Sequence, residues 1–171
     1  MGEKIIETDR LYLEEASSND DLFFLELLNS PNWLKFIGDR SIKSRSDAVG
    51  YIRNNLIKSY QDHGFGLYKV SSKLELKSIG ICGFVKRSYL EFPDIGFAIL
   101  PSYEGKGIAT EAAKAVLDFG VVQLRLTEIL GITTKENIGS QRVLNKIGLK
   151  HKNYFCPPNE KEELILFSNK K

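Results

Sequence analysis

Apolar and polar residues follow two spacings along the chain, and these spacings predict its secondary structure. Residues 10–15 (RLYLEE) alternate between apolar and polar side chains, as a half-buried strand does. The Ser-Ser-Asn-Asp cluster that follows marks a helix start, and a helix is expected over residues 20–29. Pro31 should end this helix, because proline cannot donate a backbone hydrogen bond. A short apolar patch then precedes the next helix.

The middle of the chain predicts a long helix followed by a hairpin. Ser44 and Asp47 have the spacing of a capping box, and apolar residues follow at helical spacing, so a helix is expected over residues 44–64. Residues 66–70 and 78–86 have strand patterns joined by a polar loop. These two segments are therefore expected to pair as a hairpin.

A strand that breaks at glycines and restarts as a helix follows the hairpin. Residues 94–100 (DIGFAIL) predict the strand, and Gly96 within it indicates a bulge or a close approach of the backbone. From Ile108 apolar residues recur at helical spacing, which predicts an amphipathic helix. The remaining expected elements are a buried strand at 127–134, a helix at 136–148 and a closing strand pair, YF and ELILF.

This order of elements predicts a mixed sheet with helices on both faces, an α+β (mixed α/β) architecture. The chain has 171 residues, of which 42% are hydrophobic and 27% charged. This length and composition fit a single globular domain over residues 1–171. Neither internal repeats nor a low-complexity linker interrupts the pattern.

Charge and special residues narrow the class of function. The net charge is +2 and no run of Lys or Arg is long enough for a nucleic-acid footprint, so no nucleic-acid partner is expected. The opening MGEKIIETDR has neither a basic leader nor a long apolar run, which predicts a cytoplasmic protein without a membrane anchor. Cys82 and Cys156 are expected to be free thiols, and His63 and His151 surface or helix-end residues, so no metal site is predicted.

The segment GKGIAT, residues 105–110, raises the first chemical question. A helix N-terminus has unpaired N–H groups and a partial positive charge, and it favours an anion. Glycines would let a phosphate or pyrophosphate approach that backbone, although two glycines can also serve only as a tight turn. The segment is not a P-loop and lacks the third glycine of a dinucleotide fingerprint.

Two longer segments, PDIGFAILPSYEGKGIATEA and KENIGSQRVLNKIGLK, resemble the GCN5-related N-acetyltransferase (GNAT) family and its Rim-type branch of ribosomal-protein N-terminal acetyltransferases. ETDRLYLEEA, GFGLYKV and SIGICGF extend the resemblance over nearly the whole chain. The resemblance implies a mostly antiparallel central sheet of about seven strands. It also implies acetyl-CoA as donor, with the pyrophosphate held by the backbone N–H groups of Gly105, Lys106, Gly107, Ile108, Ala109 and Thr110. Glu104 departs from the Gln or Arg that the family has there.

The resemblance further implies candidate groups for acetyl transfer. Backbone N–H groups of a splayed strand around Phe97, Ala98 and Ile99 would stabilise the oxyanion. Asp94 at the head of that strand is the candidate base, and its alternative is a solvated carboxylate at a strand end.

A proton for the departing thiolate needs a separate source. Many relatives place a Tyr where this chain has Leu144. Rim-type relatives carry N-x-x-S, matched by Asn137 and Ser140, so Ser140 could serve the CoA sulfur. The alternative makes Asn137 a helix N-cap and Ser140 a first-turn residue without a ligand.

The expected activity is direct transfer of an acetyl group from acetyl-CoA to an amine, either a protein N-terminal α-amine or a small-molecule amine. A non-catalytic CoA- or nucleotide-binding regulatory module is the alternative, because the Tyr is missing. Binding without thiol release would identify such a module. Relatives occur as monomers or homodimers, and either state is compatible with the sequence.

Overall fold

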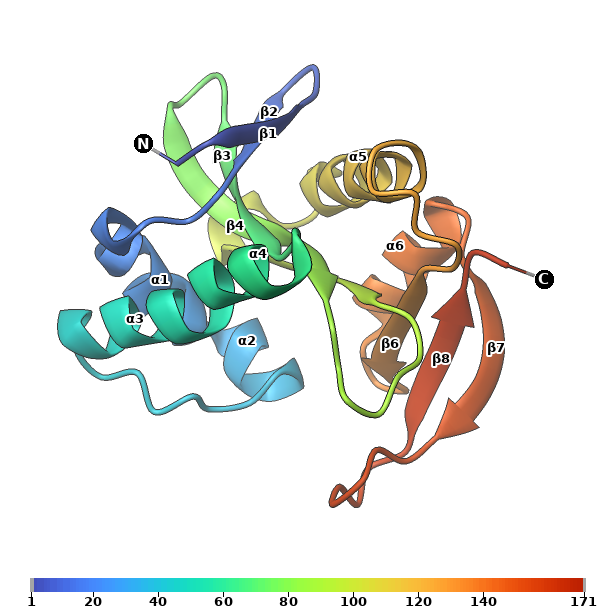
Figure 1. Cartoon of the computed structure of the whole chain (residues 1–171). Helices are drawn as coiled ribbons and strands as arrows, with labels where there is room; N and C mark the ends of the chain where they lie inside the picture. The colour runs from blue at the N-terminus through green and yellow to red at the C-terminus, as the bar shows by residue number, and fades with distance from the viewer. Residues whose placement is uncertain (1, 171) are drawn as a thin grey trace.

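A computed structural model describes residues 2–170, and its central feature is one eight-stranded sheet in the order β1-β2-β3-β4-β5-β6-β8-β7 (Figure 1). Neighbouring strands are antiparallel except for β5 and β6, which are parallel. The strands are β1 (Lys4–Glu7), β2 (Leu11–Glu14), β3 (Leu67–Ser72), β4 (Lys77–Val85), β5 (Asp94–Ile99), β6 (Leu130–Thr134), β7 (Lys150–Phe155) and β8 (Leu164–Ser168).

Two groups of helices cover the sheet (Figure 1). The first group contains α1 (Asp21–Leu28), α2 (Pro31–Phe36), α3 (Arg45–Tyr51), the π-helical η2 (Ile52–Ile57) and α4 (Lys58–His63). The second contains α5 (Ile108–Val122) and α6 (Ile138–Lys146). Short 3₁₀ turns, η1 (Ser18–Asp20) and η3 (Pro101–Tyr103), precede α1 and the glycine loop.

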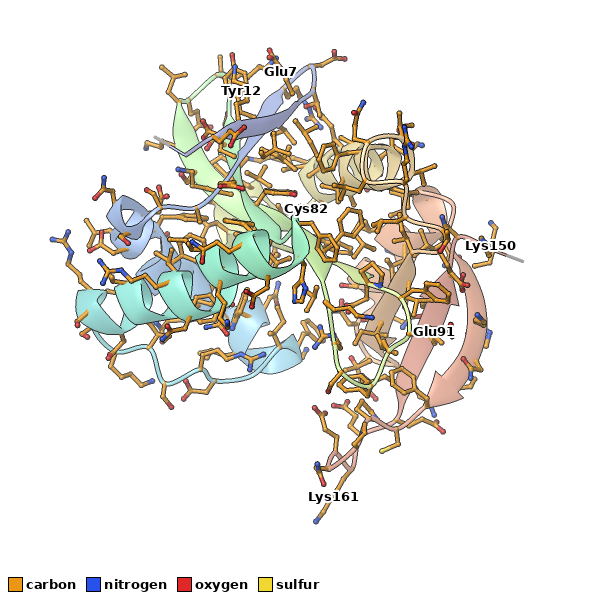
Figure 2. All side chains as sticks on the ribbon, viewed as in Figure 1. Glu7, Tyr12, Cys82, Glu91, Lys150 and Lys161 are labelled. Carbon is orange, nitrogen blue, oxygen red and sulfur yellow. The ribbon has the colours of Figure 1, made fainter. Side chains whose placement is uncertain are left out.

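Each group of helices packs on its own hydrophobic cluster. Because successive side chains of a strand point to opposite faces, Ile81 of β4 belongs to the cluster under α1–α3 and Cys82 to the cluster under α5 and α6. Cys82 is completely buried at the centre of the molecule (Figure 2). The predicted mixed sheet with helices on both faces is therefore confirmed.

Two elements differ from the sequence-based expectation. β1 was not predicted, because its four residues KIIE do not alternate between apolar and polar side chains, and it brings the sheet to eight strands rather than about seven. Pro31 does end α1, but it also begins α2 at the first helical position. Proline is well suited there, since the missing N–H has no intrahelical partner in any case.

The expected helix over residues 44–64 is present as the continuous stretch α3–η2–α4. Ser44 and Asp47 form the predicted capping box, and Gly64 closes the stretch in the left-handed conformation. Among residues 2–170, no helix is both long and apolar enough to span a bilayer.

Candidate functional site

The sheet opens where β5 and β6 separate. These strands pair at Asp94 and Leu130, where the Leu130 N–H donates to the Pro93 carbonyl at 2.9 Å. Beyond that point, within residues 2–170, β5 pairs with β4 alone, so one edge of β5 faces a gap. The splayed strand that the resemblance implied is therefore present in the structure.

The register with β4 determines which amides of β5 face this gap. The Leu100 N–H donates to the Ile79 carbonyl of the β4 side at 2.8 Å. Because amides along an antiparallel strand alternate in direction, those of Phe97 and Ile99 point away from β4 into the gap. The Ala98 amide points back to β4. The expectation that the Ala98 N–H faces the thioester is therefore corrected, although the residue itself lines the cleft.

A cleft of about 950 Å³ extends through the gap and reaches both groups of helices. Its lining includes Trp33, Phe36 and Tyr51 from the first group. It also brings together most of the predicted site residues, namely Asp94, Phe97, Ala98, Ile99, Gly105, Gly107, Ile108, Ala109, Thr110, Asn137 and Ser140. Lys106, although predicted, is not among the described residues that line the cleft.

The glycine loop presents an open helix N-terminus to this cleft. Gly105 has φ of 72° and Gly107 has φ of 75°, a left-handed conformation that favours glycine. Gly107 is the N-cap of α5 and offers no side chain to accept from the first-turn amides. These amides consequently remain available to an anion.

Glu104, the residue that departs from the family pattern, is held by the first group of helices. The Asn32 side chain of α2 donates a hydrogen bond to the Glu104 carboxylate, with Nδ2 and Oε1 2.7 Å apart. The Glu104 carboxylate therefore has a partner within the chain.

Asp94 is not a solvated carboxylate, so that alternative interpretation is wrong. Its side chain is 2% exposed, and Arg87 donates from Nε to Oδ1 at 2.8 Å and from Nη2 to Oδ2 at 3.4 Å. Burial raises the pKa of the Asp94 carboxyl, and the Arg87 guanidinium opposes this shift in part. The sequence offered no signal for this pairing with Arg87.

Asn137 and Ser140 have the local geometry of a capped helix. Asn137 is the N-cap of α6, and its Oδ1 accepts the Ser140 N–H at 3.1 Å. Within the described chain the Ser140 hydroxyl has no hydrogen-bond partner of its own, and Ser140 lines the cleft. Leu144, at the position of the family Tyr, is 1% exposed in the core.

Two buried polar atoms belong to cleft residues that sequence reasoning did not propose as ligands. The Trp33 Nε1 and the Thr134 Oγ1 lack hydrogen-bond partners in the structure. Over residues 2–170, no group of three His, Cys, Asp or Glu side chains could hold a metal ion. Cys82 and Cys156 are free thiols, as predicted.

Comparisons with known proteins identify a family for this chain and solved structures of similar fold. A family model described as an acetyltransferase (GNAT) domain matches residues 10–150. The uncharacterised N-acetyltransferase YnaD of Bacillus subtilis (strain 168) is 30% identical over 159 residues, which cover 92% of this chain and 90% of YnaD. The crystal structure of a GNAT-family acetyltransferase from Bacillus anthracis has a TM-score of 0.79 at 27% identity, covering 95% of this chain and 96% of that one. RimL, a ribosomal L7/L12 α-N-protein acetyltransferase in complex with coenzyme A, shares the fold with a TM-score of 0.83 at 15% identity, covering 97% of each chain.

Proposed function

The chain belongs to the GNAT family of acetyltransferases, and on that premise we propose that it transfers the acetyl group of acetyl-CoA directly to an α-amine. The observation that carries this proposal is the meeting of two sets of free backbone amides in one cleft. One set lies on β5 at Phe97 and Ile99, and the other at the N-terminus of α5.

The donor fits this cleft in both charge and shape. The open N-terminus of α5 suits the pyrophosphate of acetyl-CoA, with Gly105 and Gly107 allowing close approach. The gap between β5 and β6 suits the extended pantetheine arm. The coenzyme A bound to RimL, a protein of the same fold, supports this choice of donor.

The chain supplies groups for each part of the transfer. The amine attacks the thioester carbonyl, and the oxygen that becomes negative accepts hydrogen bonds from the Phe97 and Ile99 amides. The carbon–sulfur bond then breaks, and the thiolate takes a proton through the Ser140 hydroxyl or an adjoining water. The proton lost by the amine passes to Asp94, directly or through water.

The ion pair of Asp94 with Arg87 favours an α-amine as acceptor. Although burial raises the pKa of the Asp94 carboxyl, the Arg87 guanidinium limits that rise, so an amine that is already partly neutral has the advantage. An α-amine has a pKa near 8, whereas deprotonating a lysine at neutral pH costs roughly 4 kcal/mol. A protein N-terminus and a small-molecule α-amine both meet this requirement.

Thiol release with defined acceptors tests the proposal. The purified chain is mixed with acetyl-CoA and a peptide that has a free N-terminus and no lysine, or with the same peptide N-acetylated and extended by one lysine. Faster release with the free α-amine is expected, together with acetyl-CoA binding that ATP and NAD do not reproduce. Saturable binding of acetyl-CoA with no transfer to any amine would instead identify a non-catalytic module.

A further inference from the structure

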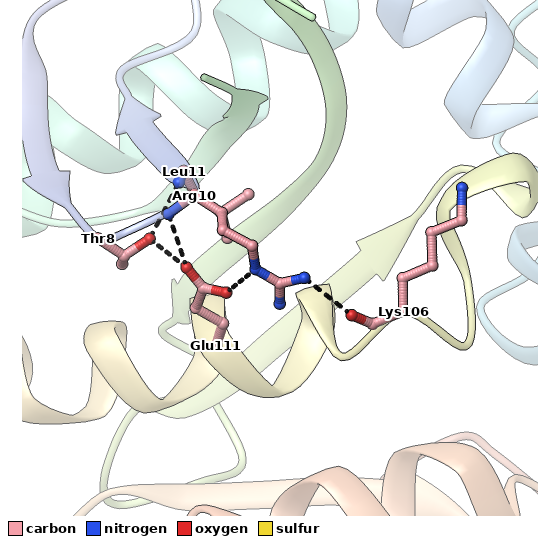
Figure 3. Close-up of polar contacts among 5 residues, drawn as sticks. All are labelled: Thr8, Arg10, Leu11, Lys106 and Glu111. Atoms are coloured by element: carbon pink, nitrogen blue, oxygen red, sulfur yellow. Dashed lines mark hydrogen bonds and ion pairs between the residues drawn. The ribbon is translucent and has the colours of Figure 1, made fainter. Parts of the chain in front are cut away.

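A polar cluster outside the cleft connects β2 to the glycine loop (Figure 3). Arg10, immediately before β2, donates from Nε to Glu111 Oε2 at 2.6 Å and from Nη1 to the Lys106 carbonyl at 3.1 Å. Glu111, in the first turn of α5, also accepts at Oε1 from the Thr8 hydroxyl at 2.6 Å and from the Arg10 backbone N–H at 3.1 Å. One guanidinium thus holds both the helix and the loop that precedes it.

The contact with the Lys106 carbonyl determines the direction of a neighbouring amide. The peptide bond between Lys106 and Gly107 is trans, so its C=O and the Gly107 N–H point in opposite directions. Among residues 2–170, Gly107 lines the cleft whereas Lys106 and Arg10 do not. Arg10 therefore holds the carbonyl on the outer side of the loop, which directs the Gly107 amide toward the cleft.

We propose that Arg10 is a positioning residue for pyrophosphate binding, which it serves by fixing the orientation of the Lys106–Gly107 peptide plane. This inference rests on the proposed use of acetyl-CoA. Gly107 has no side chain to hinder rotation of this plane, so the loop needs an external anchor. Glu111 in turn fixes the guanidinium, and its hydrogen bonds from Thr8 and Arg10 outweigh burial to lower the pKa of the Glu111 carboxyl.

Removing the anchor should weaken donors that contain a pyrophosphate. In Arg10→Ala the peptide plane can rotate, and the ligand loses a hydrogen bond to a charged group, so kcat/KM for acetyl-CoA should fall about tenfold or more. Arg10→Lys keeps the charge but has one nitrogen where two are used, so a comparable loss is expected. Recovery of wild-type kcat/KM by Arg10→Lys would show that charge alone acts and would overturn the proposal.

Glu111→Gln separates orientation from net charge. Removing a negative charge near an anion site should tighten acetyl-CoA binding if long-range electrostatics dominates. Glutamine has one acceptor oxygen for the three donors that the two oxygens of Glu111 serve, so binding should instead weaken if Arg10 must be held in place. Weaker binding supports the proposal, and tighter binding contradicts it.

Truncated donors provide the readout that a purely structural role would not give. Acetyl-dephospho-CoA keeps the pyrophosphate, and acetyl-pantetheine lacks it. The Arg10→Ala loss should be equal for acetyl-CoA and acetyl-dephospho-CoA and absent for acetyl-pantetheine. A loss confined to acetyl-CoA would mean that Arg10 contacts the 3′-phosphate. An equal loss for all three donors would mean that the substitution disturbs the protein as a whole. Either result overturns the proposal.

Folding and the underlying activity are controlled in the same experiment. Circular dichroism and thermal unfolding should show that each variant is folded at the assay temperature. A wild-type protein that is inert with acetyl-CoA would refute the proposed function itself. A wild-type protein that is active, with Arg10→Ala equally active, would refute only the role of Arg10.

Discussion

Gly107→Glu tests directly whether the pyrophosphate binds at the N-terminus of α5. The backbone at Gly107 has φ of 75° and ψ of 6°, and a side chain in this left-handed region costs about 1–2 kcal/mol. A Cβ added there would meet Arg10 Nη2 at 3.6 Å, an ordinary van der Waals contact. The variant should therefore fold, with a Tm lower by about 2–8 °C.

The effect on acetyl-CoA should be much larger than the effect on stability. The added side chain starts toward Arg10, so its carboxylate would also pair with the guanidinium and draw it away from the Lys106 carbonyl. At about 5 Å from a phosphate charge, the carboxylate repels that charge by about 3 kcal/mol at an effective dielectric constant of about 20. Solvent at this partly open site weakens the repulsion, but the carboxylate faces two phosphate charges and its side chain also occupies space that the pyrophosphate needs. We therefore expect the affinity for acetyl-CoA to fall by more than about 100-fold in a calorimetric titration.

Gly64 supplies a control matched in backbone strain. It has φ of 72° and ψ of 9° at the end of α4, and a Cβ added there meets nothing within 4 Å. Gly64→Glu should lose similar stability and keep its affinity for acetyl-CoA, while Gly107→Gln should separate bulk from charge with an intermediate loss. If folded Gly107→Glu binds acetyl-CoA as tightly as Gly64→Glu does, the pyrophosphate does not lie at this helix.

Three further predictions concern groups elsewhere in the cleft and core. Ser140→Ala should lower kcat about tenfold with an unchanged Tm, because the hydroxyl has no internal partner, and an unchanged kcat would remove that hydroxyl from the mechanism. Asn137→Ala should instead lower the unfolding free energy by about 1 kcal/mol, because α6 loses its N-cap. Asp94→Asn should lower kcat about 100-fold and change the affinity for acetyl-CoA little. Because burial raises the pKa of Asp94, the wild-type rate should fall as the pH drops through that raised value, and the variant should lack this dependence. Matching pH profiles of the two proteins would exclude Asp94 as the base. Burial raises the pKa of the Cys82 thiol, so a thiol reagent at pH 8 should label exposed Cys156 rapidly and Cys82 only after unfolding. Rapid labelling of both thiols in the folded protein would contradict the buried position of Cys82.

Elements governed by neighbouring residues were predictable. The capping box of Ser44 and Asp47 begins a helix because both partners lie within one turn. The amphipathic pattern after Ile108 likewise predicted α5, since a helix of this length buries one continuous face. Such signals are short in range, and the structure agrees with each of them.

Features that depend on distant partners were beyond the sequence pattern. β1 has little apolar alternation and exists because β2 offers it an edge. From the sequence, Pro31 could either end one helix or begin the next. In the structure it does both, and α1 and α2 on either side of it pack on the same hydrophobic cluster. Asp94 was expected at the head of a strand, but only the fold reveals its ion pair with Arg87.

The glycine loop shows why a motif predicts a site less completely than it predicts a conformation. Gly105 and Gly107 permit positive φ, so the sequence correctly indicated an open turn before α5. Glycine permits many orientations of the peptide plane, however, and therefore selects none of them. We infer that Arg10 fixes this orientation. Arg10 lies 96 positions from Lys106 in the sequence and reaches the Lys106 carbonyl because the turn between β1 and β2 lies beside the start of α5 (Figure 3). The proposed anion site is thus specified jointly by a local motif that allows the conformation and by a distant side chain that selects it.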